Sequence, residues 1–426
     1  MPTYQPRIAD NLLSGLLSRQ PLVVIEGAKG VGKTATARRL TAAGGTDMNL
    51  ESDAVLQAVQ ADPPSLAGRP RPLFVDEWQL WPSIWNELRR LVDEGAPAGS
   101  FLLAGSMIPL GARVHSGAGR AVTFRMRPMS LAERGLDQPS VSLAACLEGE
   151  APIRGAATAR FPDYMREVLA SGFPGIRALP TAQARAERLQ GYLEAVIEKD
   201  FTAYGHRVKR PATLRRWLAS FAAATSTYAT YSRILDGATP GQADKPSKTT
   251  TISYRDALSA MWLLDEVPPW AEGEAFYQRL TRAPKHFLAD PALAASLLEL
   301  DQADLCEPTG ETRPDQLFGP VSGRLFEALI AQSLQIYAQA AGATVSYFRT
   351  QDGRREVDFI IERKRRAVAV EVKLAQAVQP GDTGNLLWLK QALGPRLADA
   401  LLINTGPEAY RRRDGIAVVP ASLLGP

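Results

Sequence analysis

Strand-like runs alternate with amphipathic stretches over residues 1–130 of the chain. Between these runs, apolar residues recur at the three- and four-residue spacing of helices, as in Trp81–Val92. Strands that alternate with helices predict a doubly wound parallel sheet, in which ligands bind at the carboxyl ends of the strands. The expected strands are Leu22–Ile25, Asp47–Glu51, Leu73–Glu77, Ser100–Ser106 and Ala121–Met126.

The pattern changes further along the chain, and the sequence predicts a multidomain α/β protein. Residues 131–205 have helical periodicity and predict a helical lid, whereas residues 206–306 hold shorter helices and predict a winged-helix module. A linker rich in glycine and proline, Glu307–Pro320, precedes a mixed α/β domain over residues 320–426. The expected elements of that domain are helix Arg324–Tyr337, strands Thr344–Thr350, Glu356–Arg363 and Ala367–Leu374, helix Leu386–Leu393, and strands Ala398–Asn404 and Ile416–Val419.

Composition narrows the class of protein. The 426 residues are 45% hydrophobic and 22% charged, as in globular proteins of more than one domain. No apolar run reaches the about 18 residues of a membrane span, and the N-terminus lacks a signal-peptide pattern. We therefore expect a cytoplasmic protein without a membrane partner. Three histidines argue against a histidine-rich metal site, and a net charge of +4 does not by itself indicate nucleic-acid binding.

A glycine-rich turn follows the first apolar run. The spacing Gly27-x4-Gly32-Lys33-Thr34 fits the Walker A pattern without a mismatch. The glycines let backbone N–H groups approach the phosphates of ATP, Lys33 adds a positive charge, and the Thr34 hydroxyl can hold Mg²⁺. The predicted nucleotide-binding residues of the loop and the following helix are Gly27, Lys29, Gly30, Gly32, Lys33, Thr34 and Thr36.

Residues at the ends of two later strand-like runs, and one residue just before a third, extend this predicted ATP site. Asp76 and Glu77 end an apolar run as in a Walker B motif, so Asp76 would orient Mg²⁺ and Glu77 would polarise the attacking water. Glu77 and Lys33 are therefore the predicted catalytic residues of the ATP site. Ser106 is a candidate γ-phosphate sensor. Arg120 is a candidate arginine finger, although a solvent-facing arginine fits the sequence at least as well.

The C-terminal strands carry a second candidate site. If two of them pair as a hairpin across Lys364–Arg366, Asp358, Glu371 and Lys373 converge on one surface. Such a group suits metal-dependent phosphodiester cleavage, with Mg²⁺ or Mn²⁺ on Asp358 and Glu371 and with Lys373 positioning water. Glu327, on the preceding helix, is a further candidate ligand. For these residues taken alone, a solvated strand face with a cross-strand ion pair is the favoured alternative.

Basic residues border the predicted winged helix. They suit the phosphates of DNA and a solvated helix face equally well. DNA, ahead of RNA, is therefore a candidate partner. The cluster consists of Arg207, Lys209, Arg210, Arg215 and Arg216.

A series of short motifs covers nearly the whole chain: Pro6-Arg7, Gly27–Thr34, Asp76-Glu77-x-Gln79, Gly105-Ser106, Gly119-Arg120, Ser171–Pro174, Pro284–Asp290, Gly323–Glu327, Glu356–Phe359 and Val370–Lys373. Their order resembles a family of bacterial and archaeal AAA-type P-loop ATPases that end in a domain of unknown function (4143). Asp358 and Glu371-Val372-Lys373 are similar to the PD-(D/E)xK pattern of restriction-endonuclease-like folds. The resemblance implies ATP binding and hydrolysis beside a nuclease-like domain. Two departures are Ala104, where the family has a polar residue, and Gly27-Ala28-Lys29 in place of Gly-Pro-Arg.

The leading hypothesis is an ATPase whose nucleotide cycle controls a metal-dependent nuclease domain acting on DNA. The second hypothesis is an ATP-dependent switch that binds DNA or a partner protein, with the nuclease fold as a non-catalytic scaffold. A small-molecule kinase is weaker, because Glu77 adjoins Asp76. A homo-oligomer, in which Arg120 reaches a neighbouring site, is open.

Overall fold

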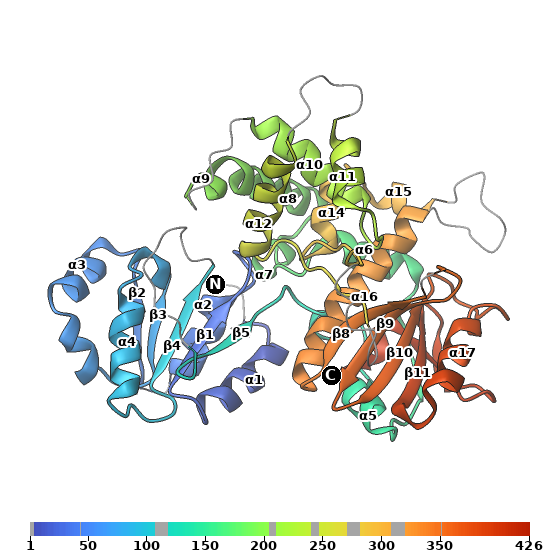
Figure 1. The fold of residues 1–426 in the computed structure, drawn as a ribbon, viewed down its shortest axis with the longest axis horizontal. Helices are drawn as coiled ribbons and strands as arrows, with labels where there is room; N and C mark the ends of the chain where they lie inside the picture. The colour runs from blue at the N-terminus through green and yellow to red at the C-terminus, as the bar shows by residue number, and fades with distance from the viewer. Residues whose placement is uncertain are drawn as a thin grey trace.

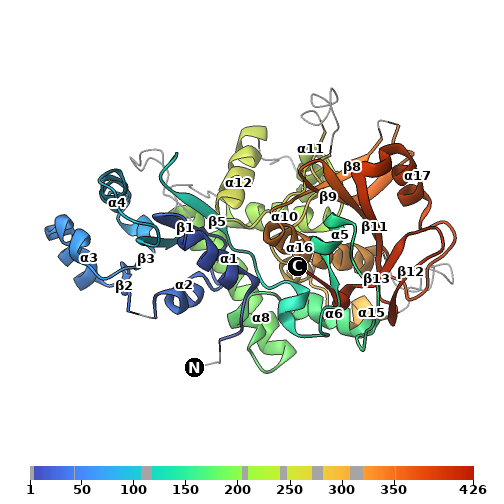
Figure 2. The same cartoon turned by 90° about the horizontal axis from the view of Figure 1, so that it is seen from below.

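The computed structural model describes residues 4–42, 44–106, 118–203, 210–239, 247–270, 282–307, 320–350 and 352–426. Three parts share this chain (Figure 1): an N-terminal sheet with its helices in blue and cyan, middle helices mainly in green and yellow, and a C-terminal sheet in orange and red. Seen from below, the two sheets lie on opposite sides of the molecule with middle helices between them (Figure 2). Residues 308–319 of the predicted linker, and Arg207 and Lys209, lie outside the described residues.

The N-terminal sheet is parallel throughout and has the strand order β2-β3-β4-β1-β5. This confirms the predicted doubly wound sheet. Because all five strands run the same way, the residues that follow β1, β3 and β4 meet at one edge. The strands are β1 Leu22–Glu26, β2 Thr46–Asn49, β3 Leu73–Asp76, β4 Phe101–Gly105 and β5 Val122–Arg125.

Helices cover both faces of this sheet. The side chains of Val23, Ile25 and Leu102 pack toward α1 and α2, whereas Val24 and Leu103 pack toward α3 and α4. Strands that are buried on both faces explain why the sequence shows near-continuous apolar runs here. The helices are α1 Ile8–Leu17, α2 Lys33–Thr41, α3 Asp53–Ala61 and α4 Ile84–Asp93, with short 3₁₀ turns η1 Pro63–Gly68 and η2 Trp78–Leu80.

The middle part is helical, and two extended segments cross it. Residues 264–267 and 285–288 pair antiparallel through Leu264 with Leu288 and Val267 with Lys285, and we call these segments the bridging pair. The winged-helix interpretation stays a prediction. The helices are α6 Phe161–Ala170, α7 Pro174–Arg177, α8 Ala182–Ala195, the π-helical turn η4 Val196–Asp200, α9 Phe201–Ala203, α10 Pro211–Ala223, α11 Tyr231–Ala238, α12 Lys248–Ala260, α14 Pro291–Leu297 and α15 Gln302–Cys306.

The C-terminal sheet has the order β7-β12-β13-β11-β10-β9-β8. The predicted hairpin is confirmed: β9 and β10 pair antiparallel, and Lys364 and Arg365 form its turn with positive φ angles. The elements are α16 Pro320–Ala340, β8 Thr344–Arg349, β9 Glu356–Arg363, β10 Arg366–Val372, α17 Gly384–Leu393, η6 Gly394–Arg396, β11 Leu397–Asn404, β12 Glu408–Arg411, β13 Ala417–Pro420, η7 Ala421–Leu423 and β14 Leu424–Gly425.

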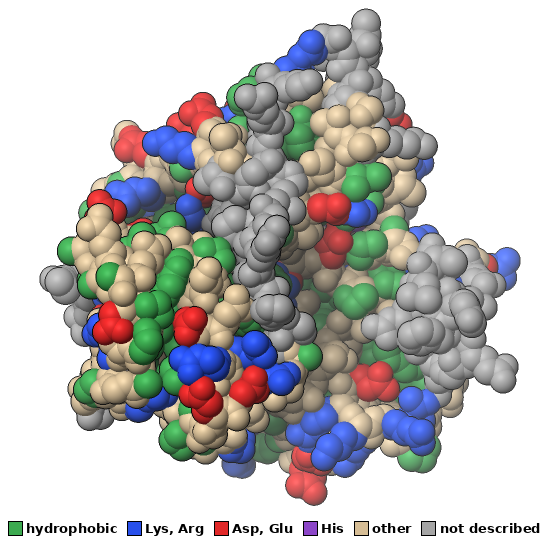
Figure 3. Space-filling view, turned by 60° about the vertical axis from the view of Figure 1, so that its left-hand side comes forward, with side chains coloured by type: hydrophobic (Ala, Val, Ile, Leu, Met, Phe, Trp, Pro, Cys, Tyr) green, Lys and Arg blue, Asp and Glu red, His purple; other side chains and the backbone are tan. Residues whose placement is uncertain are grey.

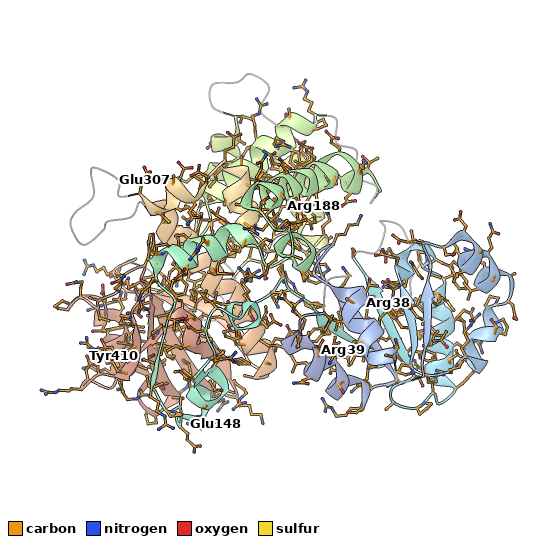
Figure 4. All side chains as sticks on the ribbon, turned by 180° about the vertical axis from the view of Figure 1, so that it is seen from behind. Arg38, Arg39, Glu148, Arg188, Glu307 and Tyr410 are labelled. Atoms are coloured by element: carbon orange, nitrogen blue, oxygen red, sulfur yellow. The ribbon has the colours of Figure 1, made fainter. Side chains whose placement is uncertain are left out.

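The segment before the lid helices belongs to the C-terminal part, which differs from the predicted lid over residues 131–205. Strand β7 Gly155–Ala156 pairs with β12, and β6 Val141–Ser142 pairs with β14. Helix α5, Leu143–Glu148, packs on β10 and β11, and Figure 4 shows Glu148 below the C-terminal sheet, away from Arg38 and Arg39. Helical periodicity could predict α5 but could not indicate which sheet it covers.

One hydrophobic core runs through all three parts. It contains Leu102 of β4, Met165 of α6, Phe326 of α16 and Val370 of β10. Continuous apolar packing means that the parts are not joined by a linker alone. Among the residues described, no helix is both long and apolar enough to cross a membrane.

Replacing Leu102 by alanine tests this core. Leu102 is fully buried in the central strand β4, so Leu102→Ala is expected to lower the free energy of unfolding by about 2–5 kcal/mol. The urea midpoint, followed by tryptophan fluorescence, measures the change. Leu80→Ala is the control, because Leu80 is 50% exposed and its loss should cost less than about 0.5 kcal/mol. Equal midpoints for the two variants would contradict the packing described.

Candidate functional site

The turn after β1 has the backbone of a phosphate-binding loop. Gly27 has a φ of 153°, and a Cβ atom at this position would lie 2.2 Å from the Met126 carbonyl oxygen. No side chain fits so close an approach, so the loop requires glycine here. Gly30 and Gly32 also have positive φ angles, and Gly32 is the N-cap of α2. The first N–H groups of α2 therefore face the same edge of the sheet as the loop.

Lys33 begins α2, and its ammonium group lies inside the loop. The side chain is 6% exposed, and Nζ donates hydrogen bonds to the carbonyl oxygens of Gly27 at 2.7 Å and Ala28 at 3.1 Å. Ser106, which follows β4, accepts a third bond from Nζ at 3.3 Å. Burial lowers the pKa of Lys33 to about 8, although Glu77 and Asp76 oppose this shift.

Thr34 and Asp76 meet at the end of β3. The Thr34 hydroxyl donates a hydrogen bond to Asp76 Oδ1 at 3.1 Å, and Asp76 is 4% exposed. Burial raises the pKa of Asp76, against the bond from Thr34. A hydroxyl and a buried carboxylate beside a phosphate loop are the oxygen donors that hold Mg²⁺ in such sites. The residues present therefore fit Mg²⁺, and Thr34 and Asp76 would hold it.

Glu77 has an unusual backbone conformation for a non-glycine residue. Its φ is 52° and its ψ is 41°, a left-handed geometry that is typical of functional positions. The Gln79 side-chain amide donates a hydrogen bond to Glu77 Oε2. Burial raises the pKa of Glu77, against this bond. A Cβ atom on Gly105 would lie 2.4 Å from Gln79 Oε1, so glycine before Ser106 leaves room for the glutamine that orients Glu77.

Arg120 lies at the other edge of the sheet. It precedes β5, whose parallel pairing with β1 places its start beside Val23 rather than beside the loop. Its Nε donates to Asp93 Oδ1 at 2.7 Å, and both side chains are 40% exposed. The prediction of Arg120 as a γ-phosphate ligand of this chain's own site is therefore wrong. A role across an oligomer interface stays a prediction.

Arg7 lies beside the phosphate loop, and the sequence motifs assign no role to it. The side chain is 6% exposed, and its guanidinium donates to the carbonyl oxygens of Val31 at 2.9 Å and Arg127 at 2.8 Å. It also pairs with Glu133 at 3.0 Å. Arg7 therefore fixes the phosphate loop against the segment that leaves β5. Pro6-Arg7 was part of the resemblance, but its contacts lie too far apart in sequence to be predicted.

Residues of the middle helices lie beside the loop. Lys29 pairs with Asp200 of the π-helical turn at 2.6 Å, and the Tyr192 hydroxyl donates to the Lys29 carbonyl at 3.2 Å. The ring of Phe173 approaches Gly30, while Pro174 approaches Gly32. Lys29, predicted as a phosphate ligand, thus lies half-exposed and bound to the lid. The phosphate loop is therefore a contact surface for the middle helices.

A cavity of about 1270 Å³ opens beside this loop. It is lined by Arg7, Gly32 and Thr36 on one side, and by α6–α8 and the α14–α15 region on the other. Thr36, a predicted nucleotide contact, is buried and shares a 2.8 Å hydrogen bond with the Tyr4 hydroxyl. The cavity is large enough for a nucleoside next to the phosphate site.

The C-terminal candidates converge, but around a lysine that was not predicted. Lys285 of the bridging pair is 1% exposed, and Nζ lies 2.9 Å from Asp358 Oδ1 and also contacts Glu327 Oε1. Asp358 Oδ2 accepts a hydrogen bond from the Val372 N–H at 2.9 Å. Both oxygens of Asp358 therefore already have partners.

Glu371 pairs with Lys373, which lies two residues along the same segment, whereas the alternative drawn from the sequence was an ion pair across two strands. Lys373 Nζ donates to Glu371 Oε1 at 2.8 Å, while Glu371 Oε2 is buried without a partner. The Glu371 side chain itself is buried rather than solvated. Lys373 is the outer member of the pair, with its side chain 36% exposed.

Burial and neighbouring charges shift the pKa values of these carboxylates in opposite directions. Burial opposes ionisation of Asp358, but Lys285 and the Val372 N–H outweigh it and lower the pKa of Asp358. Burial and the charge of Asp358 raise the pKa of Glu371 and of Glu327 to about 8. Among the described residues no group of three or more His, Cys, Asp or Glu side chains could hold a metal ion. The residues present do not fit Mg²⁺ or Mn²⁺ here.

The parallel sheet and its phosphate loop give the N-terminal part a fold like that of P-loop ATPases. In agreement, residues 19–134 match the family model of an AAA domain. Residues 322–424 match a domain of unknown function (DUF4143), and residues 161–304 match another (DUF8612), across the predicted boundary at 205 and 206. The restriction-endonuclease-like interpretation of the C-terminal domain stays a prediction.

Relatives extend over almost the whole chain. Uncharacterized proteins of Mycobacterium bovis and Mycobacterium tuberculosis are each 25% identical over 413 residues, which cover 96% of this chain and 82% of the relative. Among solved structures, the Walker-type ATPase PABY2304 of Pyrococcus abyssi covers 68% of this chain and 94% of its own, at 14% identity and a TM-score of 0.39. The ORC2 protein of Aeropyrum pernix covers 76% and 92%, at 14% identity and a TM-score of 0.28. Both structural likenesses are distant.

The low pKa of Lys33 predicts a pH-dependent affinity for ATP. The ammonium form binds phosphate, and it is lost as the pH rises through about 8. The dissociation constant for ATP should therefore increase about tenfold from about pH 7 to about pH 9. Calorimetry measures it. Lys33→Arg is the control, because arginine keeps its charge, so binding by that variant should be flat over this range. An equal pH dependence in both proteins would assign the titration to another group.

Proposed function

We propose that this protein is a Mg²⁺-dependent ATPase that works as a conformational switch, with the C-terminal domain as its non-catalytic output. The observation that carries the proposal is the meeting of Lys33, Thr34 and Asp76 around one phosphate loop. Mg²⁺ bound there would neutralise charge on the β- and γ-phosphates. The proposal corresponds to the second hypothesis drawn from the sequence.

The side chains that surround the phosphate loop have defined tasks in hydrolysis. Water attacks the γ-phosphorus, the bond to the bridging oxygen of ADP breaks, and ADP and phosphate leave. Glu77 accepts a hydrogen bond from that water and orients it, and its raised pKa makes it a stronger base than an exposed glutamate. Lys33 turns from the loop carbonyls to the phosphates, and Ser106, which already bonds Lys33, lies where it could sense the γ-phosphate.

Contacts from the loop to the middle part support the switch. Arg7 joins the carbonyl oxygens of Val31 and Arg127, and Arg127 in turn makes a two-pronged ion pair with Asp265 at 2.6 and 3.2 Å. Asp265 lies on the bridging pair, and its N–H donates to the Phe287 carbonyl. A loop that changes its backbone on binding phosphate would alter this chain of contacts. Spatial continuity motivates the coupling, and nucleotide-dependent measurements must test it.

Nuclease action on DNA has less support. Lys285 takes up an oxygen of Asp358, and in the part of the chain that the structure describes no group of three or more His, Cys, Asp or Glu side chains could hold a metal. On the face shown in Figure 3, basic side chains in blue and acidic side chains in red are intermingled. Such a mixed surface does not favour a broad contact with phosphates. DNA as a partner therefore stays a prediction from the basic cluster.

Glu77→Gln separates binding from hydrolysis. The substitution keeps the size of the side chain but removes the base, so ATP turnover should fall about 10²–10⁴-fold. ATP affinity should change little, because Lys33 and the loop N–H groups remain. Phosphate release and calorimetry measure the two quantities. Glu94→Gln is the matched control, because Glu94 is the C-cap of α4 in the same domain and its side chain is 55% exposed. Full turnover in Glu77→Gln would remove Glu77 from the mechanism.

Incubation with nucleic acid tests the competing nuclease function. Plasmid DNA and single-stranded RNA, with Mg²⁺ or Mn²⁺ and with or without ATP, should stay intact, because Asp358 is bound to Lys285. Gel electrophoresis gives the readout. The variants Lys33→Ala and Asp358→Ala are tested in parallel under the same conditions. Cleavage by the natural chain that disappears in Asp358→Ala would restore the nuclease hypothesis, and cleavage that persists would indicate a contaminant.

A further inference from the structure

We propose that Lys285 is the resident cation of the C-terminal carboxylate site, so that an ammonium group of the middle part closes this site in place of a divalent metal. The ion pairs of Lys285 with Asp358 and Glu327 then join the bridging pair to the C-terminal domain, and we call them the lock. This inference does not depend on ATP hydrolysis.

The position of the ammonium group carries the inference. Nζ of Lys285 lies between Glu327 of α16 and Asp358 of β9, the carboxylates that the sequence pattern assigns to a metal. The aromatic rings of Phe359 and Tyr228 lie 5.4 and 5.6 Å from the same nitrogen. A desolvated cation between two carboxylates and two ring faces has a complete set of partners.

The backbone of Lys285 holds this cation in place. Its N–H donates to the Val267 carbonyl, and its carbonyl accepts from the Val267 N–H, each at 2.9 Å. The ammonium group therefore cannot leave by a rotamer change alone, because the side chain is 1% exposed and its main chain is part of the bridging pair. Its departure requires movement of the bridging pair against β9.

The remaining polar groups leave few ligands for a metal. Asp358 Oδ2 is taken by the Val372 N–H, and Glu371 Oε1 is taken by Lys373. Glu371 Oε2 is buried and has no hydrogen-bond partner among the residues described. A divalent ion needs several oxygen ligands, so it can enter only where the lysine is removed.

Titration with Mn²⁺ tests the lock in the full-length, nucleotide-free protein. The natural chain is expected to show no Mn²⁺ binding that depends on Asp358, as measured by calorimetry and by the spin resonance of free Mn²⁺. Lys285→Ala should gain one Mn²⁺ site, at least tenfold tighter than any binding by the natural chain. Lys285→Ala with Asp358→Asn should lose that site. Lys364→Ala, an exposed lysine in the β9–β10 turn, is the matched control and should behave like the natural chain.

Stability gives a second readout. Lys285→Ala should have a lower thermal midpoint, and Mn²⁺ should raise the midpoint of this variant more than that of the natural chain. The proposal is overturned if the natural chain binds Mn²⁺ and Asp358→Asn abolishes that binding, or if folded Lys285→Ala gains no site. Should Lys285→Ala not fold, the comparison of the natural chain with Asp358→Asn still decides, because equal Mn²⁺ responses support the lock and a lost site refutes it.

Discussion

The ion pair between Arg127 and Asp265 is the contact on which the arrangement of the three parts depends. Asp265 is 6% exposed and receives Arg127 at two oxygens and Arg125 at 2.9 Å. Burial disfavours the charged carboxylate, but the two arginines outweigh it and lower the pKa of Asp265. The stabilisation is therefore present above the ordinary aspartate range and is lost as the pH falls through the lowered value. Removing Asp265 would leave both arginines without this carboxylate, at a cost of about 3–5 kcal/mol.

Other joints between the parts also rest on buried charges. Arg134, from the segment after the N-terminal sheet, bonds the Glu167 carbonyl of α6 and the Gln332 side chain of α16. Asp290 lies 3.7 Å from the same guanidinium and accepts the Gly172 N–H at 2.6 Å. Buried ion pairs of this kind often add little net stability compared with apolar residues. They do require one relative position of the elements, since any other position leaves a charge without a partner. These buried charges therefore restrict how α6 and α16 lie relative to the segment that leaves the N-terminal sheet.

The N-terminal site could be predicted because its determinants are local in sequence. Gly27 to Thr34 form one turn and one helix start, and Asp76, Glu77 and Ser106 each follow an apolar strand of a parallel sheet. Topology then brings them to one edge without further information. The same topology places Arg120 away from the phosphate loop. Arg120 precedes β5, and a parallel strand begins at the end of the sheet opposite the loop. Arg7 could not be assigned, since its partners Val31, Arg127 and Glu133 meet only in the folded chain.

The C-terminal site shows where a motif ceases to be sufficient. The alternation of strand residues and the Lys364-Arg365 turn correctly place Asp358 near Glu371. The spacing of two carboxylates indicates that a positive charge must lie between them, but it does not indicate whether that charge is a metal ion or a side chain. An ammonium group with hydrogen-bonding N–H groups and a divalent ion both meet that requirement, and they differ in charge and in ligand number. Lys285 lies far upstream in the sequence, on a segment that pairs with Val267 in the middle part. It reaches Asp358 of β9 only because the middle part folds against the C-terminal sheet. A pattern confined to the C-terminal strands is therefore compatible with a metal site and with an internal ion pair. Lys285, which distinguishes the two, belongs to the middle part of the chain.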